Sequence, residues 1–290
     1  MYGAVASCCG GGDCMVDPSE FPILFGKKRP ITGLATELAA LSRSELCREY
    51  EELRRCAPNR GFRKKPYLVK DREWTSKDES NRFEERLAMA LCHMEGWRCS
   101  RMGNFRVLDR QVPLQAKKVD VGIGEVDLLG VTDAGRLVVI ELKVKPEGEG
   151  RAREGNPAAA LVQGLRYAAI ISANHEVIAN DARHLFEADV SEDPPMVVVL
   201  APQAWWRDWL EPPGSTRKAM GDWEQEFDRL ARDVEARLDL VVECLALEDV
   251  EPSELAGATP RLDSELKVYG VHLVAVPAIG SALASLRSHP

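Results

Sequence analysis

Two acidic residues and a lysine occur in the sequence at a spacing that can place them on one face of a β-hairpin. Asp127 precedes the tripeptide Asp-Ala-Gly at residues 133–135, and Glu141 and Lys143 follow it. Asp-Ala-Gly is suited to a three-residue hairpin loop whose glycine takes the left-handed conformation. If the residues that flank the loop pair with each other, Asp127 lies directly opposite Glu141. Lys143 then points to the same face as Glu141, because side chains two apart in a strand share a face.

The chemistry that this arrangement suggests is metal-assisted hydrolysis. Two opposed carboxylates with Cβ atoms about 5 Å apart repel each other and destabilise a sheet. A divalent cation between Asp127 and Glu141 removes the conflict, because Mg²⁺ prefers hard oxygen ligands. Lys143, which we expect to point into an open polar site, could orient a metal-bound water and balance charge on a phosphate. The structural alternative is a solvent-facing strand with an ordinary ion pair, since Glu-x-Lys is a common sequence.

A helical glutamate could add a third carboxylate to such a site. Apolar residues at helical spacing predict a helix over residues 78–94, and Glu84 falls near the edge of its buried face. A carboxylate at that position could reach a metal ion at the sheet. The structural alternative is an exposed helical side chain, and the same role is open to two other acids, Glu79 and Glu85.

A helix after the hairpin carries polar residues on its inner face. The Asn-Pro pair at residues 156–157 predicts the start of a helix that runs to about residue 173. Gln163 and Tyr167 share one face of this helix. A buried Gln163 amide needs a partner, which could be a phosphate, a metal-bound water or, in the structural alternative, a backbone carbonyl.

In their order and spacing, these residues resemble the PD-(D/E)XK nuclease superfamily, whose fold is restriction-endonuclease-like. The resemblance covers residues 78–175, about a third of the chain, and is strongest with the C-terminal nuclease domain of the archaeal and actinobacterial mismatch-cleaving endonuclease. The chain outside this region does not resemble that enzyme, so mismatch specificity is not implied. The segments that carry the resemblance are Phe83-Glu84, Gly124-Glu125-Val126-Asp127, Glu141-Leu142-Lys143 and Gln163-x-x-Arg166-Tyr167.

The resemblance implies a role for each of these residues. Lys143 would be the catalytic lysine, and Gln163 and Tyr167 would be auxiliary residues of the catalytic site. Mg²⁺ would be the cofactor, with Mn²⁺ able to substitute. Three residues would be metal ligands, namely Asp127, Glu141 and Glu84.

The function that we expect is therefore a metal-dependent nuclease, an endonuclease that hydrolyses phosphodiester bonds in DNA, with RNA left open as a substrate. Two other classes of function stay open. One is a catalytically inactive nucleic-acid-binding scaffold, because a fold does not guarantee activity. The other is a partner-dependent component of antiphage defence or a toxin. A homodimer or a protein partner is compatible with either.

Composition narrows the class of protein further. The 290 residues have a formal net charge of −8, which argues against nucleic-acid binding through bulk positive charge alone. No apolar stretch is long enough for a membrane-spanning helix, so a membrane partner is not expected. The eight cysteines form no pair of C-x-x-C knuckles, and no secretory leader is evident. Free thiols in a reducing cytoplasm are the simplest interpretation.

Basic residues are concentrated between Arg54 and Arg72, where acids are few. This stretch could be an arm that contacts phosphates, or a solvated linker. It lies within an N-terminal appendage, residues 1–73, whose first 30 residues look poorly structured because they are rich in glycine and proline. Two short helices should follow, around residues 34–41 and 42–53.

Residues 74–290 should form the nuclease-like domain, with an α/β extension at its C-terminal end. Helices and strands alternate in a way that predicts an α/β fold, a mixed sheet flanked by helices. A further helix is expected over residues 217–238. Strands are expected at 105–115, 119–123, 126–131, 137–144, 196–201, 240–247 and 266–276.

Overall fold

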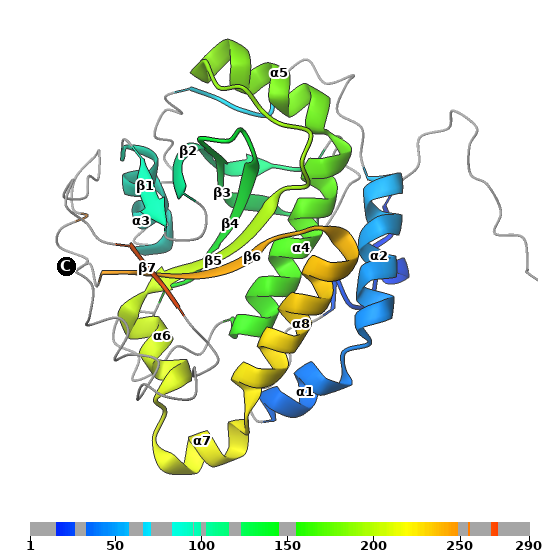
Figure 1. Cartoon of the computed structure of the whole chain (residues 1–290), viewed down its shortest axis with the longest axis vertical. Helices are drawn as coiled ribbons and strands as arrows, with labels where there is room; N and C mark the ends of the chain where they lie inside the picture. The colour runs from blue at the N-terminus through cyan, green and yellow to red at the C-terminus, as the bar shows by residue number, and fades with distance from the viewer. Residues whose placement is uncertain are drawn as a thin grey trace, which may run out of the picture.

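The chain folds into a mixed β-sheet covered by helices on both faces (Figure 1). The structure is a computed structural model, which describes residues 16–26, 33–57, 66–70, 83–94, 96–99, 103–115, 123–144, 155–248, 255 and 268–271. No helix in these ranges is long and apolar enough to cross a membrane.

The sheet places its strands side by side in the order in which they occur along the chain, β1 to β7. Neighbours from β1 to β4 are antiparallel, β4–β5 and β5–β6 are parallel, and β7 is antiparallel to β6. The two edge strands are short, β1 (Trp97–Cys99) and β7 (Val268–Gly270). The five longer strands are β2 (Gly103–Pro113), β3 (Glu125–Thr132), β4 (Leu137–Leu142), β5 (Met196–Pro202) and β6 (Val242–Leu247). The predicted mixed α/β architecture is thus confirmed.

One face of the sheet is covered by helices from both ends of the sequence, and α3 packs on the opposite face (Figure 1). On the first face α4 lies against β4 and β5, and Gly164 permits the close approach: a Cβ there would lie 2.6 Å from Val197 Cγ1. The helices are η1 (Pro18–Glu20), α1 (Leu34–Ala40), α2 (Arg43–Cys56), α3 (Phe83–Cys92), α4 (Pro157–Ala173), α5 (His175–Phe186), α6 (Gln203–Leu210), α7 (Gly214–Met220) and α8 (Trp223–Leu238).

The β3–β4 hairpin has the predicted register. Leu128 pairs with Ile140 and Val131 with Leu137. The Thr132 amide donates to the Arg136 carbonyl at 2.9 Å, which closes the loop. Gly135 has φ +84°, the left-handed conformation that this loop was expected to need.

Two expectations about helices have different outcomes. The helix predicted from residue 156 is confirmed as α4, and the Asn156 side chain accepts a bond from the Ala159 amide at 2.8 Å. The single helix predicted over 217–238 is wrong, because the chain breaks between α7 and α8. Gly221 there has φ +66°, which an α-helix cannot contain.

The expectation that residues 1–30 lack structure is wrong for the part described, 16–26. Phe21 and Leu24 are buried, and η1 begins this segment. The carboxylate of Glu49 on α2 accepts hydrogen bonds from the backbone amides of Ile23 and Leu24, each at 3.0 Å. A long-range polar contact therefore fixes a segment whose local sequence favours no regular element.

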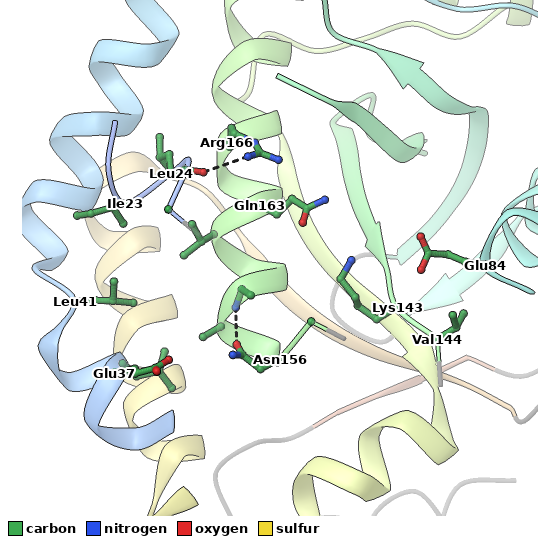
Figure 2. A pocket seen from close by; sticks show the side chains of 16 residues that line it. Ile23, Leu24, Glu37, Leu41, Glu84, Lys143, Val144, Asn156, Gln163 and Arg166 are labelled. Atoms are coloured by element: carbon green, nitrogen blue, oxygen red, sulfur yellow. Dashed lines mark hydrogen bonds between the residues drawn. The ribbon is translucent and has the colours of Figure 1, made fainter. Parts of the chain in front are cut away.

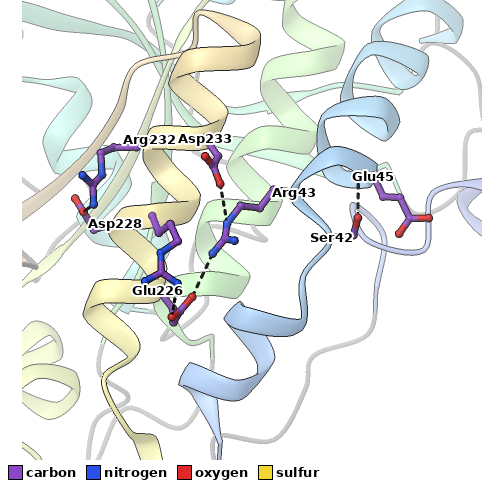
Figure 3. A network of polar contacts seen from close by, with 8 residues as sticks. Ser42, Arg43, Glu45, Glu226, Asp228, Arg232 and Asp233 are labelled. Atoms are coloured by element: carbon purple, nitrogen blue, oxygen red, sulfur yellow. Dashed lines mark hydrogen bonds and ion pairs between the residues drawn. The ribbon is translucent and has the colours of Figure 1, made fainter.

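The predicted N-terminal appendage packs directly on the rest of the fold. Leu34 and Leu53 belong to the same hydrophobic cluster as the residues under α4 and α8. The Arg43 guanidinium forms ion pairs with Glu226 at 3.2 Å and Asp233 at 2.9 Å, both on α8 (Figure 3). The division at residue 73 thus does not coincide with a separate hydrophobic core, and it stays a sequence-based prediction.

The basic stretch lies partly outside the described residues, which include 54–57 and 66–70. Arg54 and Arg55 form ion pairs with acids one turn away on α2. Tyr67 and Leu68 are buried, and the Tyr67 amide donates to the Asp181 carboxylate at 2.7 Å. This part of the stretch is anchored to α5 rather than fully solvated. The strand predicted at 119–123 falls almost wholly outside the described residues.

Candidate active site

Asp127 and Glu141 meet where the β3–β4 hairpin stops pairing, on the face covered by α4. The last backbone pair is Leu128–Ile140, so Asp127 and Glu141 occupy the next position of the same register. Asp127 Oδ2 accepts a hydrogen bond from the Leu142 amide at 2.8 Å, which holds its side chain across the gap between the strands. Glu141 is completely buried, whereas Asp127 keeps some exposure.

Lys143 follows at the end of β4 and is an ion-pair partner of Glu141. Its ammonium also donates to the Leu142 carbonyl at 3.2 Å, and its backbone amide is bonded to Leu200 on β5. Gly155 gives the aliphatic stem room, since a Cβ there would lie 3.1 Å from the Lys143 stem. Lys143 lines a cavity with polar residues in its wall, but its side chain is only 14% exposed, so it lies deeper than the open polar site that we expected. The buried Glu141 charge draws the ammonium inward.

Burial and neighbouring charges shift the pKa values of all three groups. Burial and the adjacent Glu141 charge raise the pKa of Asp127 to about 8. Burial also raises the pKa of Glu141, although Lys143 opposes this. Burial alone would lower the pKa of Lys143, but the three carboxylates around it raise it overall. At neutral pH the carboxylate pair therefore retains a proton, which a bound cation would displace.

The polar face of α4 lies against the carboxylate pair. Tyr167 is buried, and its hydroxyl accepts hydrogen bonds from Gln163 Nε2 at 3.0 Å and from Arg166 Nη2 at 3.2 Å. Burial and the nearby Glu141 charge raise the pKa of Tyr167 to about 12. The partner of the Gln163 amide is therefore a tyrosine hydroxyl, and neither a backbone carbonyl nor a ligand is needed to explain it. Gly124, with φ +85°, makes room for the ring.

Glu84 reaches the same region from the first turn of α3, on the other side of the sheet. It lies with Lys143 in the wall of one cavity (Figure 2), and its charge raises the pKa values of Lys143 and Glu141. Glu85 does not line this cavity. Glu79 lies outside the described residues. The structure therefore brings Glu84, of the two described candidates, toward the predicted site.

The cavity has a volume of about 400 Å³ and extends from Lys143 and Glu84 along α4 to the N-terminal segment. Its polar wall includes Gln163, Arg166 and Asn156, and its opposite wall is largely apolar (Figure 2). The apolar wall comes from Ile23, Leu24, Leu38 and Leu41 of the N-terminal part of the chain. Sequence reasoning missed these N-terminal residues. The apolar residues at 16, 21, 23 and 24 were the only available sign that this segment is packed.

The carboxylate pair fits a hard divalent cation, although a three-carboxylate cluster is not formed. Glu141 Oε2 is buried and receives no hydrogen bond other than the one from the protonated Asp127, so displacing the proton of the pair leaves this oxygen available to a cation. Mg²⁺ keeps several waters and is often held by only one or two carboxylates. Within the residues that the structure describes, no group of three His, Cys, Asp or Glu side chains is placed to hold a metal. Asp127 and Glu141 would therefore be the ligands, and a ligand role for Glu84 stays a prediction.

Comparison with protein-family models, with curated proteins and with solved structures found no match to this chain.

Proposed function

We propose that this protein is a metal-dependent nuclease that hydrolyses phosphodiester bonds in DNA, and that its sheet and helices form a restriction-endonuclease-like domain. The observation that carries the proposal is the pair of carboxylates at the end of the hairpin. Asp127 and Glu141 are brought together from two strands, Glu141 Oε2 has no donor other than the proton that the pair retains, and Lys143 lies beside them. A protein core rarely contains such a pair for structural reasons, because burying like charges together is unfavourable.

The side chains have distinct tasks in the proposed reaction. A bound Mg²⁺ would polarise the scissile phosphate and lower the pKa of the attacking water. Asp127 and Glu141 hold the ion, and Lys143 stabilises negative charge that develops on the phosphate. Tyr167 and Gln163 pack as a hydrogen-bonded unit behind the carboxylates and fix their surroundings. Glu84 adds negative charge in the wall of the same cavity, which favours a cation there.

A cleavage assay on linear, circular and single-stranded DNA, with Mg²⁺ or Mn²⁺, tests the proposal. Wild type should cleave at least one form only when metal is present. Lys143→Met keeps the buried stem and removes the charge, so it should lower the cleavage rate by about 10²-fold or more. Lys218→Met, an exposed lysine on α7, is the matched control and should cleave like wild type. The proposal fails if wild type cleaves no nucleic acid.

One observation favours a second candidate, a nucleic-acid-binding scaffold without activity. The Lys143 ammonium forms a direct ion pair with Glu141. In a scaffold this ion pair would be permanent and structural. Such a protein would bind DNA with equal affinity in EDTA and in Mg²⁺, and Lys143→Met would change stability without changing any reaction.

A further inference from the structure

Arg166 is a positive charge in the wall of the cavity that the proposed mechanism does not use. It lies on α4, three residues after Gln163, and Figure 2 shows Gln163 between it and Lys143. Its guanidinium bonds only to neutral oxygens. Nη2 donates to the Tyr167 hydroxyl at 3.2 Å, and Nη1 donates to the Leu24 carbonyl at 3.5 Å, a long hydrogen bond.

The rest of the guanidinium is poorly satisfied. Nε is buried and has no hydrogen-bond partner. Among the ion pairs of the described residues, none joins Arg166 to a carboxylate, in contrast to Arg43, Arg217 and Arg229. A guanidinium offers five N–H donors in a planar fork that matches phosphate oxygens. Arg166 therefore has donor capacity to spare beside the proposed catalytic residues, and its charge acts on Glu141 without forming a direct ion pair.

The N-terminal segment holds this guanidinium in place. Its central carbon lies 4.9 Å from the ring centroid of Phe25 and 4.9 Å from that of Tyr167. These contacts are of the cation–π type and restrict the orientation of the side chain. The Leu24 carbonyl adds a further contact. The fork is thus oriented before any ligand binds, which reduces the entropy lost on binding.

We propose that Arg166 is a phosphate-binding residue, which contacts a backbone phosphodiester of the DNA strand in this cavity, next to the phosphate that is cleaved. The proposal rests on the proposed nuclease function and adds a subsite to it. A purely structural role, a tie between α4 and the N-terminal segment, is the competing explanation. The two differ in one measurable respect, because only a phosphate contact releases counterions when DNA binds.

The test measures the affinity of the full chain for short fluorescein-labelled DNA, duplex and single-stranded, in EDTA over a series of salt concentrations. Arg166→Gln should weaken binding and make the slope of log K against log salt less steep by about 0.9 for duplex or about 0.7 for single-stranded DNA. Arg166→Lys keeps the charge and should keep most of the slope. Arg183→Gln, an exposed arginine of α5, is the matched control and should leave the slope unchanged.

Three outcomes would overturn the subsite. The first is an Arg166→Gln slope equal to that of wild type, in a wild-type protein that does bind and cleave DNA, which leaves the nuclease proposal standing. The second is stabilisation of wild type, but not of Arg166→Gln, by inorganic phosphate alone with no effect on DNA binding, which would assign a free anion. The third applies if Arg166→Gln does not fold: a slope for Arg166→Lys that is less steep than that of wild type by about 0.9 for duplex or about 0.7 for single-stranded DNA, because that variant retains the charge. Failure of wild type to cleave DNA would instead remove the nuclease proposal itself.

Discussion

Asp127, Glu141 and Lys143 together carry a charge that depends on how many protons the two carboxylates hold. Glu141 is fully buried and bonded to Lys143, while Asp127 bonds to the Leu142 amide. The raised pKa of Asp127, about 8, means that the folded protein binds a proton that the unfolded chain releases near pH 4. Without a bound cation, the two carboxylates therefore repel each other most strongly at alkaline pH, where both are ionised.

The raised pKa of Asp127 predicts how the stability of the metal-free protein depends on pH. Because the pKa of Asp127 is higher in the folded state, the free energy of unfolding should fall as pH rises from about 4 through 8. Asp127→Asn lacks this titration, so it should be more stable than wild type by several kcal/mol above pH 8 and lose the advantage at pH 4. Urea denaturation in EDTA at several pH values measures the pH dependence of wild type and the stability difference between it and Asp127→Asn. Asp189→Asn, an exposed acid, is the control. Parallel curves for Asp127→Asn and wild type would show that Asp127 is ionised normally.

The elements around the site follow from local sequence to different degrees. The hairpin was predictable, because the chemistry of its three-residue loop fixes which residues of the two flanking strands lie opposite each other. The start of α4 was equally local, since Asn156 caps it. The break at Gly221 was missed, because the apolar spacing from Trp223 onward extends smoothly from the preceding turn. The spacing of apolar residues indicates which residues face the core, but it does not indicate where one helix ends.

The close packing of α4 on the sheet can be tested by a substitution at Gly164. A Cβ at Gly164 would lie 2.6 Å from Val197 Cγ1, so Gly164→Ala must displace α4 or β5. We expect a loss of about 1–3 kcal/mol in the free energy of unfolding, with weaker cleavage because Gln163 and Tyr167 move with the helix. Gly214→Ala is the matched control, since nothing lies within 4 Å of its Cβ. It should be neutral or slightly stabilising. Equal denaturation midpoints for the two variants would contradict the tight packing of α4.

At the scale of the whole molecule, the cavity joins the N-terminal segment to the hairpin site. The positions of Asp127, Glu141 and Gln163 could be predicted, because each lies on an element with a strong local pattern. The apolar wall from Ile23 and Leu24 could not be predicted, because it depends on a contact with Glu49 that no local sequence pattern indicates. The burial of the Lys143 side chain was also not predicted, because it depends on the packing of α4 over the end of β4.

Glu49 makes this long-range contact testable. Glu49→Ala leaves the part-buried amide of Ile23 and the buried amide of Leu24 without an acceptor, so it should cost about 2 kcal/mol. Hydrogen exchange at these two amides should accelerate more than exchange in the core of the sheet. Glu52→Ala, an exposed residue of the same helix, should change neither. Unchanged exchange at Ile23 and Leu24 in Glu49→Ala would show that the segment is held by other contacts.

The central claim is that Asp127 and Glu141 form a metal centre, and a direct titration with Mn²⁺ tests it most simply. Wild type should bind the ion, more tightly as pH rises, because binding displaces a proton from the pair. Lys143→Met should still bind, since both carboxylates remain, whereas Asp127→Asn should bind far more weakly because an amide is a poorer ligand. Binding that is absent in wild type, or that is equal in wild type and Asp127→Asn, would contradict the account.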